Sequence, residues 1–72
     1  MLERKQAMAA LKDALELLPP QQRLVVTMRD VEGFDSKDVC NLLEISETNQ
    51  RVLLHRGRSK LRRLLDGHLA GS

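Results

Sequence analysis

Two adjacent prolines, Pro19 and Pro20, are the feature that most restricts how this chain folds. Proline removes a backbone donor and clashes with the preceding turn of a helix, so a helix that reaches this point must stop. Proline is well tolerated at the first position of a helix, so Pro20 suits the start of another. The pair therefore predicts a sharp corner between two helices, one over about Glu3 to Leu18 and one from Pro20 to about Glu32.

Apolar side chains recur at helical spacing on both sides of this corner. In the first stretch they follow at steps of three and four: Met8, Leu11, Leu15 and Leu18. The second stretch has an apolar side made of Leu24, Val25, Met28 and Val31. Gly33 supplies the usual left-handed stop, and we expect Phe34 to fold back onto the core.

Two further helices are predicted after Gly33. Asp35 or Ser36 is suited to cap a short helix that ends near Leu43. Ser46 is a second strong cap, and the long stretch after it contains no proline. A fourth helix over about Glu47 to Asp66 follows, roughly 30 Å long at 1.5 Å per residue. Residues 67–72 are expected to form a frayed tail.

The third and fourth predicted helices have the pattern of a helix-turn-helix, because a short turn joins them and the second helix carries basic charge. Cys40 supplies a small side chain where the second helix must cross closely, and we expect it to be a small buried hydrophobe. We expect Ile45 to pack inside the turn, and Leu53 and Leu54 to pack the second helix against the core.

The length and composition fit one small domain over residues 1–72. Phe34 is the single aromatic residue of 72, so the core must be aliphatic, which favours helices over sheet. No apolar run approaches the ~18 residues that span a membrane, and no signal peptide is apparent, so we expect a cytoplasmic protein with no membrane partner. The predicted fold is all-α: a compact bundle of four helices with a C-terminal helix-turn-helix and a long basic recognition helix.

Basic residues are concentrated in the predicted fourth helix. From Thr48 to Leu65 there are six basic residues and no acidic one, whereas the rest of the chain holds the other six basic residues and all ten acidic ones. At ~100° per residue, these cations form an arc separate from the apolar face. Because solvated helix faces normally interleave acidic residues, the arc favours nucleic acid as a partner. An ordinary solvated face and a membrane or calmodulin-like partner are the alternatives.

No set of residues indicates catalysis, so we expect neither an enzyme nor a bound cofactor. The sequence has no glycine-rich phosphate loop, paired-carboxylate site or nucleophile motif. Cys40 lacks a cysteine or histidine at metal-ligand spacing and has no partner for an internal disulfide. His55 lies on the basic face. Two interpretations are open for it: a contact with a DNA groove or a phosphate, or a surface histidine without a binding role.

Four segments in this order and spacing resemble region 4 of a bacterial sigma factor of the extracytoplasmic-function group. They are Leu-Pro-Pro-Gln-Gln-Arg (18–23), Asp-Val-Glu-Gly-Phe (30–34), Leu-Glu-Ile-Ser-Glu (43–47) and Leu-His-Arg-Gly-Arg-Ser-Lys-Leu-Arg (54–62). The resemblance covers about Leu15 to Leu65. A complete factor has a second domain that nothing here matches, so the resemblance implies an isolated region 4.

The resemblance implies that the domain binds the −35 element of double-stranded promoter DNA in the major groove and docks on the β flap of RNA polymerase. An anti-sigma factor is a further implied partner. The base-reading positions of the family fall on Thr48, Asn49, Arg51, Val52 and His55. Its backbone-binding positions fall on Arg56 and Arg58, and Ser36 and Lys37 match positions that reach an upstream phosphate.

Three residues depart from the family pattern. Glu44 replaces a glycine in the turn, so the turn has either a different geometry or some strain. Gln50 replaces an apolar core residue, and Leu53 replaces a residue that is often basic and faces DNA. One way to reconcile these two exchanges is a slight roll of the helix, through which Leu53 takes over the packing.

Two other functions are compatible with the pattern. The output domain of a response regulator also uses a serine cap before a basic second helix. A protein-interaction bundle bound by an anti-sigma factor is the second alternative, but it would be expected to lose the basic arc. The Pro19-Pro20 corner and the segment from His55 to Arg58 favour the sigma-factor interpretation.

Overall fold

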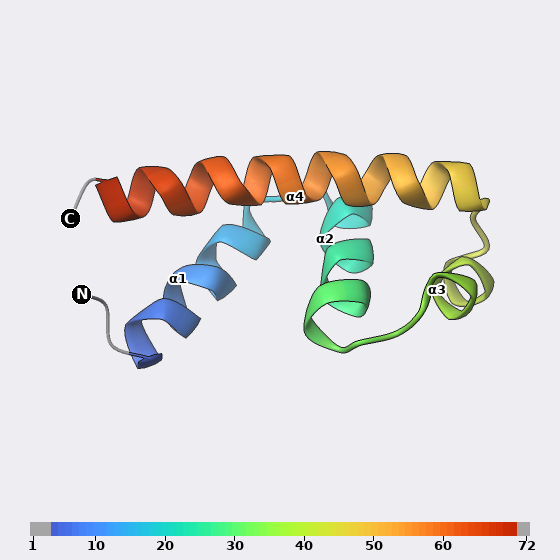
Figure 1. Ribbon diagram of the computed structural model, residues 1–72, viewed down its shortest axis with the longest axis horizontal. Helices are drawn as coiled ribbons and strands as arrows, with labels where there is room; N and C mark the ends of the chain where they lie inside the picture. The colour runs from blue at the N-terminus through green and yellow to red at the C-terminus, as the bar shows by residue number, and fades with distance from the viewer. Residues whose placement is uncertain (1–3, 71–72) are drawn as a thin grey trace.

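The computed structural model describes the backbone of residues 4–70 and the side chains of residues 4–67. Its elements are α1 (Arg4–Glu16), α2 (Pro20–Val26), the π-helical segment η1 (Thr27–Val31), α3 (Ser36–Leu43) and α4 (Glu47–Ala70). Figure 1 shows α4 as a rod along one side of the molecule, with the other helices arranged beneath it. The predicted all-α fold of four helices with a long C-terminal helix is therefore confirmed.

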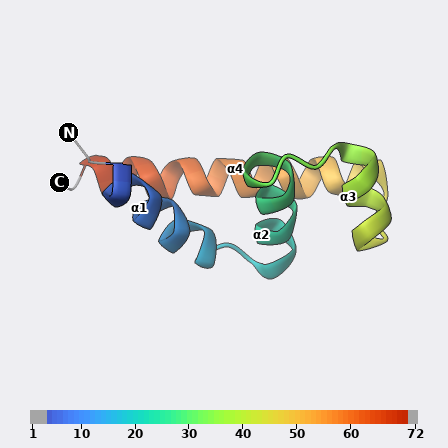
Figure 2. The same cartoon turned by 90° about the horizontal axis from the view of Figure 1, so that it is seen from below.

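The long helix α4 sets the dimensions of the molecule. Its 24 residues correspond to about 36 Å, close to the longest molecular extent of 39 Å. The view turned by 90° shows α2 crossing α4, while α3 lies beside the N-terminal end of α4 (Figure 2). The described helix continues to Ala70, past the expected end near Asp66, because one glycine such as Gly67 weakens a helix by ~1 kcal/mol without removing its hydrogen bonds. The expectation of a frayed tail over residues 67–72 is therefore wrong for residues 67–70, and residues 71–72 lie outside the described part of the chain.

The predicted corner between the first two helices is present. Pro19 has extended backbone angles (φ −54°, ψ 147°), and Pro20 takes the first position of α2. The backbone N–H of Arg23 donates to the carbonyl of Pro19 at 2.9 Å, which closes the first turn. The corner sends α2 across α4 and away from the direction of α1.

The core is aliphatic and is formed by side chains from the α1–α2 corner, α2, α3 and α4. Its buried members are Leu18, Val25, Val26, Val39 and Leu54. Half-buried hydrophobic residues pack against them: Leu15, Met28, Leu43, Ile45, Leu53 and Leu61. The core therefore holds α2 and α3 against the N-terminal half of α4, which is the half predicted to bind nucleic acid.

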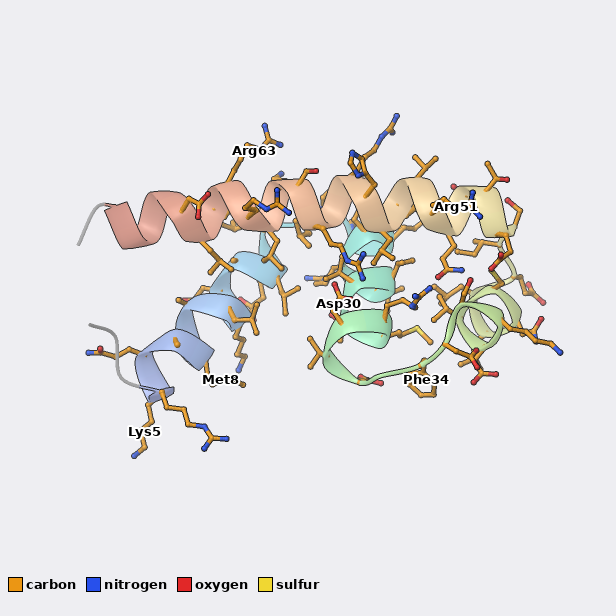
Figure 3. All side chains as sticks on the ribbon, viewed as in Figure 1. Lys5, Met8, Asp30, Phe34, Arg51 and Arg63 are labelled. Atoms are coloured by element: carbon orange, nitrogen blue, oxygen red, sulfur yellow. The ribbon has the colours of Figure 1, made fainter. Side chains whose placement is uncertain are left out.

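The apolar face of α1 differs from the predicted stripe. Ala10 and Ala14 are buried, whereas Met8 is 59% exposed and points away from α4 (Figure 3). The expectation for Met8 is therefore wrong. The rest of the predicted stripe faces inward, since Leu18 is buried and Leu15 packs against the core. The two small alanines are covered as well, whereas the larger Met8 side chain stays exposed.

Gly57 allows the close crossing of α2 and α4. A Cβ atom at Gly57 would lie 2.6 Å from Val26 Cγ2 and 3.4 Å from the backbone oxygen of Gln22. Any side chain here would push α2 away. The sequence placed Gly57 on the apolar face of this helix, but the need for a glycine comes from α2.

The second predicted helix changes its winding before it ends. Residues Thr27–Val31 form one wider π-helical turn, and the N–H of Glu32 donates to the carbonyl of Thr27 at 2.9 Å. Gly33 then has a φ of 81°, which confirms the expected left-handed stop. The wider turn brings both Arg29 and Asp30 within hydrogen-bonding distance of α4 side chains.

Phe34 does not join the buried core, so that expectation is wrong. Its backbone N–H donates to the carbonyl of Met28 at 2.8 Å, but the residue is 38% exposed. Leu24 and Val31 are also on the surface, at 48% and 53% exposure. Smaller aliphatic side chains of α2, α3 and α4 already fill the core, so these three remain exposed.

Candidate nucleic-acid interface

Side-chain caps fix the starts of both helices of the helix-turn-helix. Oδ1 of Asp35 accepts a hydrogen bond from the backbone N–H of Asp38 at 2.8 Å. Oγ of Ser46 accepts one from the N–H of Asn49 at 3.0 Å. These contacts satisfy backbone donors that have no partner within the helix. Of the two cap candidates for α3, the structure uses Asp35, and the predicted helix-turn-helix is confirmed.

The turn between the two helices is left-handed at Glu44, with φ 56° and ψ 48°. Glu44 is the one non-glycine residue with positive φ among those the structure describes. The N–H of Ile45 donates to the carbonyl of Cys40 at 3.1 Å and holds the turn in place. The chain therefore tolerates strain at Glu44 rather than adopting a different turn.

The predicted base-reading residues lie on one outer face of α4. Thr48, Asn49, Arg51, Val52 and His55 are all exposed. A groove of about 360 Å³ runs along this face and is lined by Thr48, Arg51, Val52, His55 and Arg56. Figure 3 shows Arg51 near the start of α4, at the end of the molecule opposite α1. Most of the predicted contact residues thus come together in one place.

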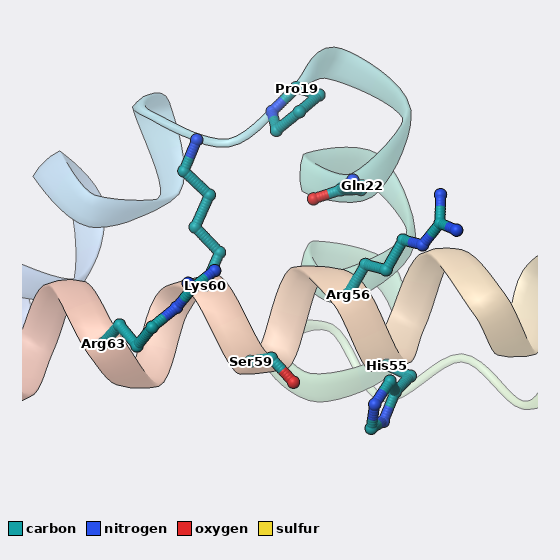
Figure 4. Close-up of a pocket in the computed structure, with 7 residues that line it drawn as sticks. All are labelled: Pro19, Gln22, His55, Arg56, Ser59, Lys60 and Arg63. Carbon is teal, nitrogen blue, oxygen red and sulfur yellow. The ribbon is translucent and has the colours of Figure 1, made fainter.

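A second groove continues toward the C-terminal half of α4. It has a volume of about 400 Å³ and lies between α4 and the α1–α2 corner (Figure 4). Its lining residues are Pro19, Gln22, His55, Arg56, Ser59, Lys60 and Arg63. Because His55 and Arg56 line both grooves, the two grooves form one continuous basic track along α4. Four of its lining residues carry full positive charges: Arg51, Arg56, Lys60 and Arg63.

Sequence reasoning did not single out several residues of this second groove as contacts. Lys60 and Arg63 belong to the acid-free segment of α4, so charge alone was a usable signal for them. Pro19 and Gln22 carry no such signal. They reach the groove only because α2 crosses α4 at Gly57.

Arg58 has a different environment from Arg56. Its Nε and Nη2 atoms donate to Oδ2 and Oδ1 of Asp30 at 2.8 and 2.5 Å. The hydrogen bonds from Arg58 are the main reason that the pKa of Asp30 lies below its ordinary value of 3.8, and they also raise the pKa of Arg58. Arg58 is therefore directed toward η1 and lines neither groove of the track.

Ser36 and Lys37 open α3 beside the start of α4. Lys37 is exposed, whereas Ser36 is half-buried. The Ser36 hydroxyl donates to Oε1 of Glu47 and accepts a hydrogen bond from Nε2 of Gln50 at 2.6 Å. Ser36 and Arg51 both line a small cavity of about 170 Å³. Ser36 therefore faces α4, and its single proton is already donated to a carboxylate.

Gln50 is buried, so the suggested roll of α4, through which Leu53 would take over its packing position, is wrong. Its side chain is 2% exposed and remains on the inner face of α4. Leu53 does pack against the core, half-buried beside Leu43 and Ile45, but it does so together with Gln50 and not in its place. Cys40 is half-buried and accepts a hydrogen bond from Gln50, so it is not the purely apolar core residue that was expected.

A long second helix with a capped start and an exposed basic track defines the chain as a helix-turn-helix DNA-binding domain. The sequence matches the family model described as Sigma-70, region 4, over residues 8–61. The chain therefore belongs to the sigma-70 region 4 family, as the resemblance predicted.

Three sigma factors are similar to most of the chain. The RNA polymerase sigma factor SigZ of Bacillus subtilis (strain 168) is 30% identical over 63 residues, which are 88% of this chain and 36% of the relative. The ECF RNA polymerase sigma factor SigE of Mycolicibacterium smegmatis is 37% identical over 60 residues, covering 83% of this chain and 23% of the relative. The RNA polymerase sigma factor CarQ of Myxococcus xanthus is 42% identical over 55 residues, covering 76% and 32%.

The aligned segment spans no more than 36% of the length of these relatives. No solved structure matches the chain. Within the described residues, none of the helices has the length and apolar character needed to cross a membrane.

Proposed function

We propose that this chain is the part of an extracytoplasmic-function sigma factor that recognises the −35 element of promoter DNA. The observation that carries the proposal is the groove on the outer face of α4, because five of the predicted contact residues line it together. The domain acts by binding and has no catalytic step.

The N-terminal turns of α4 are the part that enters the major groove. A B-DNA major groove is about 12 Å wide and admits one α-helix, and the first residues of such a helix reach the base edges. Arg51 is the candidate for a bidentate contact with guanine, and Thr48 and Asn49 supply further hydrogen bonds. Val52, at 40% exposure, offers an apolar surface to a thymine methyl group.

The second groove of the track is suited to the sugar–phosphate backbone. Lys60 and Arg63 lie two to three helical turns beyond Arg51, roughly 14–18 Å along the axis at 1.5 Å per residue. This separation exceeds the width of the major groove, so their positive charges meet phosphates at its edge. Arg56 lies between the two regions and holds phosphate as well.

The exposed apolar side chains after the corner are the proposed surface for RNA polymerase. Of the six apolar residues from Leu24 to Phe34, Val25 and Val26 are buried in the core and Met28 packs against it. Leu24, Val31 and Phe34 remain on the surface, where they are available to the β flap or to an anti-sigma factor. An anti-sigma factor that covers these residues or the basic track would compete with promoter binding.

Two alternatives use the same fold. In a response-regulator output domain, α4 would also read DNA, but no polymerase flap would bind. In a protein-interaction bundle, DNA binding would be absent altogether. The exposed basic track favours a DNA reader, and membership of the sigma-70 region 4 family favours the promoter role over the response-regulator role.

Selection of bound sequences from a random duplex pool tests DNA recognition most directly. The chain is attached to RNA polymerase core, and the best duplex is then titrated against a scrambled duplex of equal length. We expect enrichment of one short element and weaker binding to the scrambled duplex. A pool that stays unenriched while the protein is folded would reject the proposal.

A second experiment separates polymerase docking from DNA reading. The thermal unfolding of the chain is measured with a flap-tip peptide or an anti-sigma domain present well above micromolar concentration. A partner that binds only the folded state raises the melting temperature by mass action. If neither partner raises the melting temperature while DNA binding is intact, the chain binds DNA only, and polymerase docking is rejected.

A further inference from the structure

Gln50 is the one buried polar side chain among the residues that the structure describes. It lies on the inner face of α4 between Asn49 and Arg51, two residues proposed to reach DNA. A buried amide without partners destabilises a fold, so the hydrogen bonds of Gln50 decide whether it is tolerated. All of its polar atoms have partners in the structure.

The partners of Gln50 come from three different segments. Oε1 accepts a hydrogen bond from Nη1 of Arg29 in η1 at 2.7 Å. Nε2 lies 3.1 Å from the carbonyl of Ser36, 2.6 Å from Ser36 Oγ and 3.0 Å from Cys40 Sγ, all of them in α3. One carboxamide thus connects η1, α3 and α4.

Chemistry permits only one orientation of this carboxamide. The guanidinium of Arg29 has donors only, so it must face Oε1. The carbonyl of Ser36 can only accept, so it must face Nε2. A flipped amide would place donor against donor and acceptor against acceptor, so the side chain cannot rotate without losing its contacts on both sides.

We propose that Gln50 is a positioning residue that fixes α3 and α4 relative to each other and thereby sets the sequence specificity of the domain. This inference rests on the proposed function. Gln50 binds Ser36 at the start of α3, and Arg51, which follows Gln50 in α4, is the proposed reader of bases. Ser36, Gln50 and Arg51 line one small cavity, so the start of α3 and the base-reading turn of α4 share one support.

Hydrogen bonds fix this geometry in a way that apolar packing does not. A hydrogen bond weakens steeply when its angle or distance changes, whereas an apolar side chain keeps most of its contact energy when a neighbouring helix slides slightly. A leucine at position 50 would fill the core but leave the angle between α3 and α4 less defined. Such a change misplaces Arg51 on the bases while its charge still attracts the duplex.

The test compares Gln50→Leu with the unchanged chain by fluorescence anisotropy, on the selected duplex and on a scrambled one. We expect affinity for the selected duplex to fall about tenfold, within the range for a lost base contact, while affinity for the scrambled duplex stays within about twofold. Gln21→Leu, the same chemical change at an exposed residue of α2, is the control and should alter neither affinity. Equal losses on both duplexes, or no loss on either, would overturn the proposal.

A second measurement does not depend on DNA. Residual dipolar couplings of backbone amides report whether α3 and α4 share one alignment. We expect one common alignment tensor for both helices in the unchanged chain and separate tensors, with smaller couplings for α3, in Gln50→Leu. A common tensor in the variant would overturn the positioning role even if DNA binding changed.

The two measurements also separate this proposal from promoter recognition. If the unchanged chain shows no sequence preference but α3 loosens in Gln50→Leu, Gln50 positions the helices and promoter recognition is rejected. If Gln50→Leu does not fold, Gln50→Met provides the same comparison, because the unbranched methionine side chain adapts to irregular gaps in a core. A methionine variant with the full preference and a rigid α3 would reject the proposal.

Discussion

Arg58 of α4 and Asp30 of η1 form a two-pronged ion pair, with N–O distances of 2.8 and 2.5 Å. Their side chains are 49% and 36% exposed. The pair links the π-helical turn to the middle of α4. It also gives Arg58, a predicted phosphate contact, a carboxylate partner within the chain.

Asp30→Asn should therefore strengthen binding to DNA of any sequence. The substitution removes the negative charge that pairs with Arg58 and leaves Arg58 free to contact a phosphate. We expect the slope of log K against log salt to steepen by about one unit, since one more counterion is released. Titration of a scrambled duplex at several salt concentrations measures this slope, with Asp13→Asn on α1 as a control of equal charge change. An unchanged slope would show that Arg58 does not reach DNA.

The same ion pair predicts how stability depends on pH. The pKa of Asp30 is lowered in the folded chain, mainly by the hydrogen bonds from Arg58. A group with a lowered folded pKa contributes stability above its unfolded pKa and loses it as the pH falls through the folded pKa. The contribution should be at most about 1 kcal/mol, because both side chains are substantially exposed.

Urea unfolding of the unchanged chain and of Asp30→Asn at several pH values measures this contribution. Titration of the other carboxylates is common to both proteins and largely cancels in the difference. The difference in unfolding free energy should be constant above about pH 5 and shrink at more acid pH. A difference that grows toward acid pH would contradict the sign.

Arg51→Ala and Arg56→Ala should differ in kind. Arg51 lies in the first turns of α4, and loss of a bidentate contact with guanine should cost about 1–3 kcal/mol of discrimination. Arg56 borders both grooves, so its loss should weaken binding to all sequences similarly. Competition between selected and scrambled duplexes separates the two effects. A relaxed sequence preference in Arg56→Ala alone would reverse the assignment.

Removal of both Lys60 and Arg63 should reduce the salt dependence of DNA binding. With three to five phosphate contacts, the slope of log K against log salt should be about −3 to −5 for the unchanged chain. The double alanine variant should show a slope about two units shallower. Alanine at both Lys5 and Lys12 removes the same charge from two exposed positions of α1 that line neither groove, and should leave the slope unchanged. Figure 3 shows Lys5 at the end of α1 that lies away from α4. Equal effects of the two double variants would indicate that only net charge matters.

Glu44→Gly should stabilise the domain. The left-handed conformation of Glu44 costs a residue with a Cβ atom about 1–2 kcal/mol, whereas glycine adopts it freely. The gain is partly offset by the greater freedom of glycine in the unfolded chain, so we expect a net gain of about 0.5–1 kcal/mol. Chemical denaturation measures this gain. The converse change, Gly33→Ala at a φ of 81°, should destabilise the domain.

Local signals in the sequence determined where most of the helices begin. Pro20, Asp35 and Ser46 act within one turn of themselves, through a fixed φ angle or a side-chain hydrogen bond to a nearby N–H, and these starts were predicted correctly. The basic face of α4 could also be predicted from the sequence, because the known period of a helix determines which residues share a face.

Long-range contacts decided the rest, because they depend on which helix lies opposite a residue. Ala10 and Ala14 of α1 are buried whereas the larger Met8 is exposed, so hydrophobicity alone did not decide which side of α1 is covered. Arg58 and Arg56 look equivalent in the sequence, but only Arg58 lies within reach of Asp30. Gln50 looked like a polar substitution in an apolar position. It is accommodated because Arg29 and Ser36, distant along the chain, supply the donor and the acceptor that a buried amide requires.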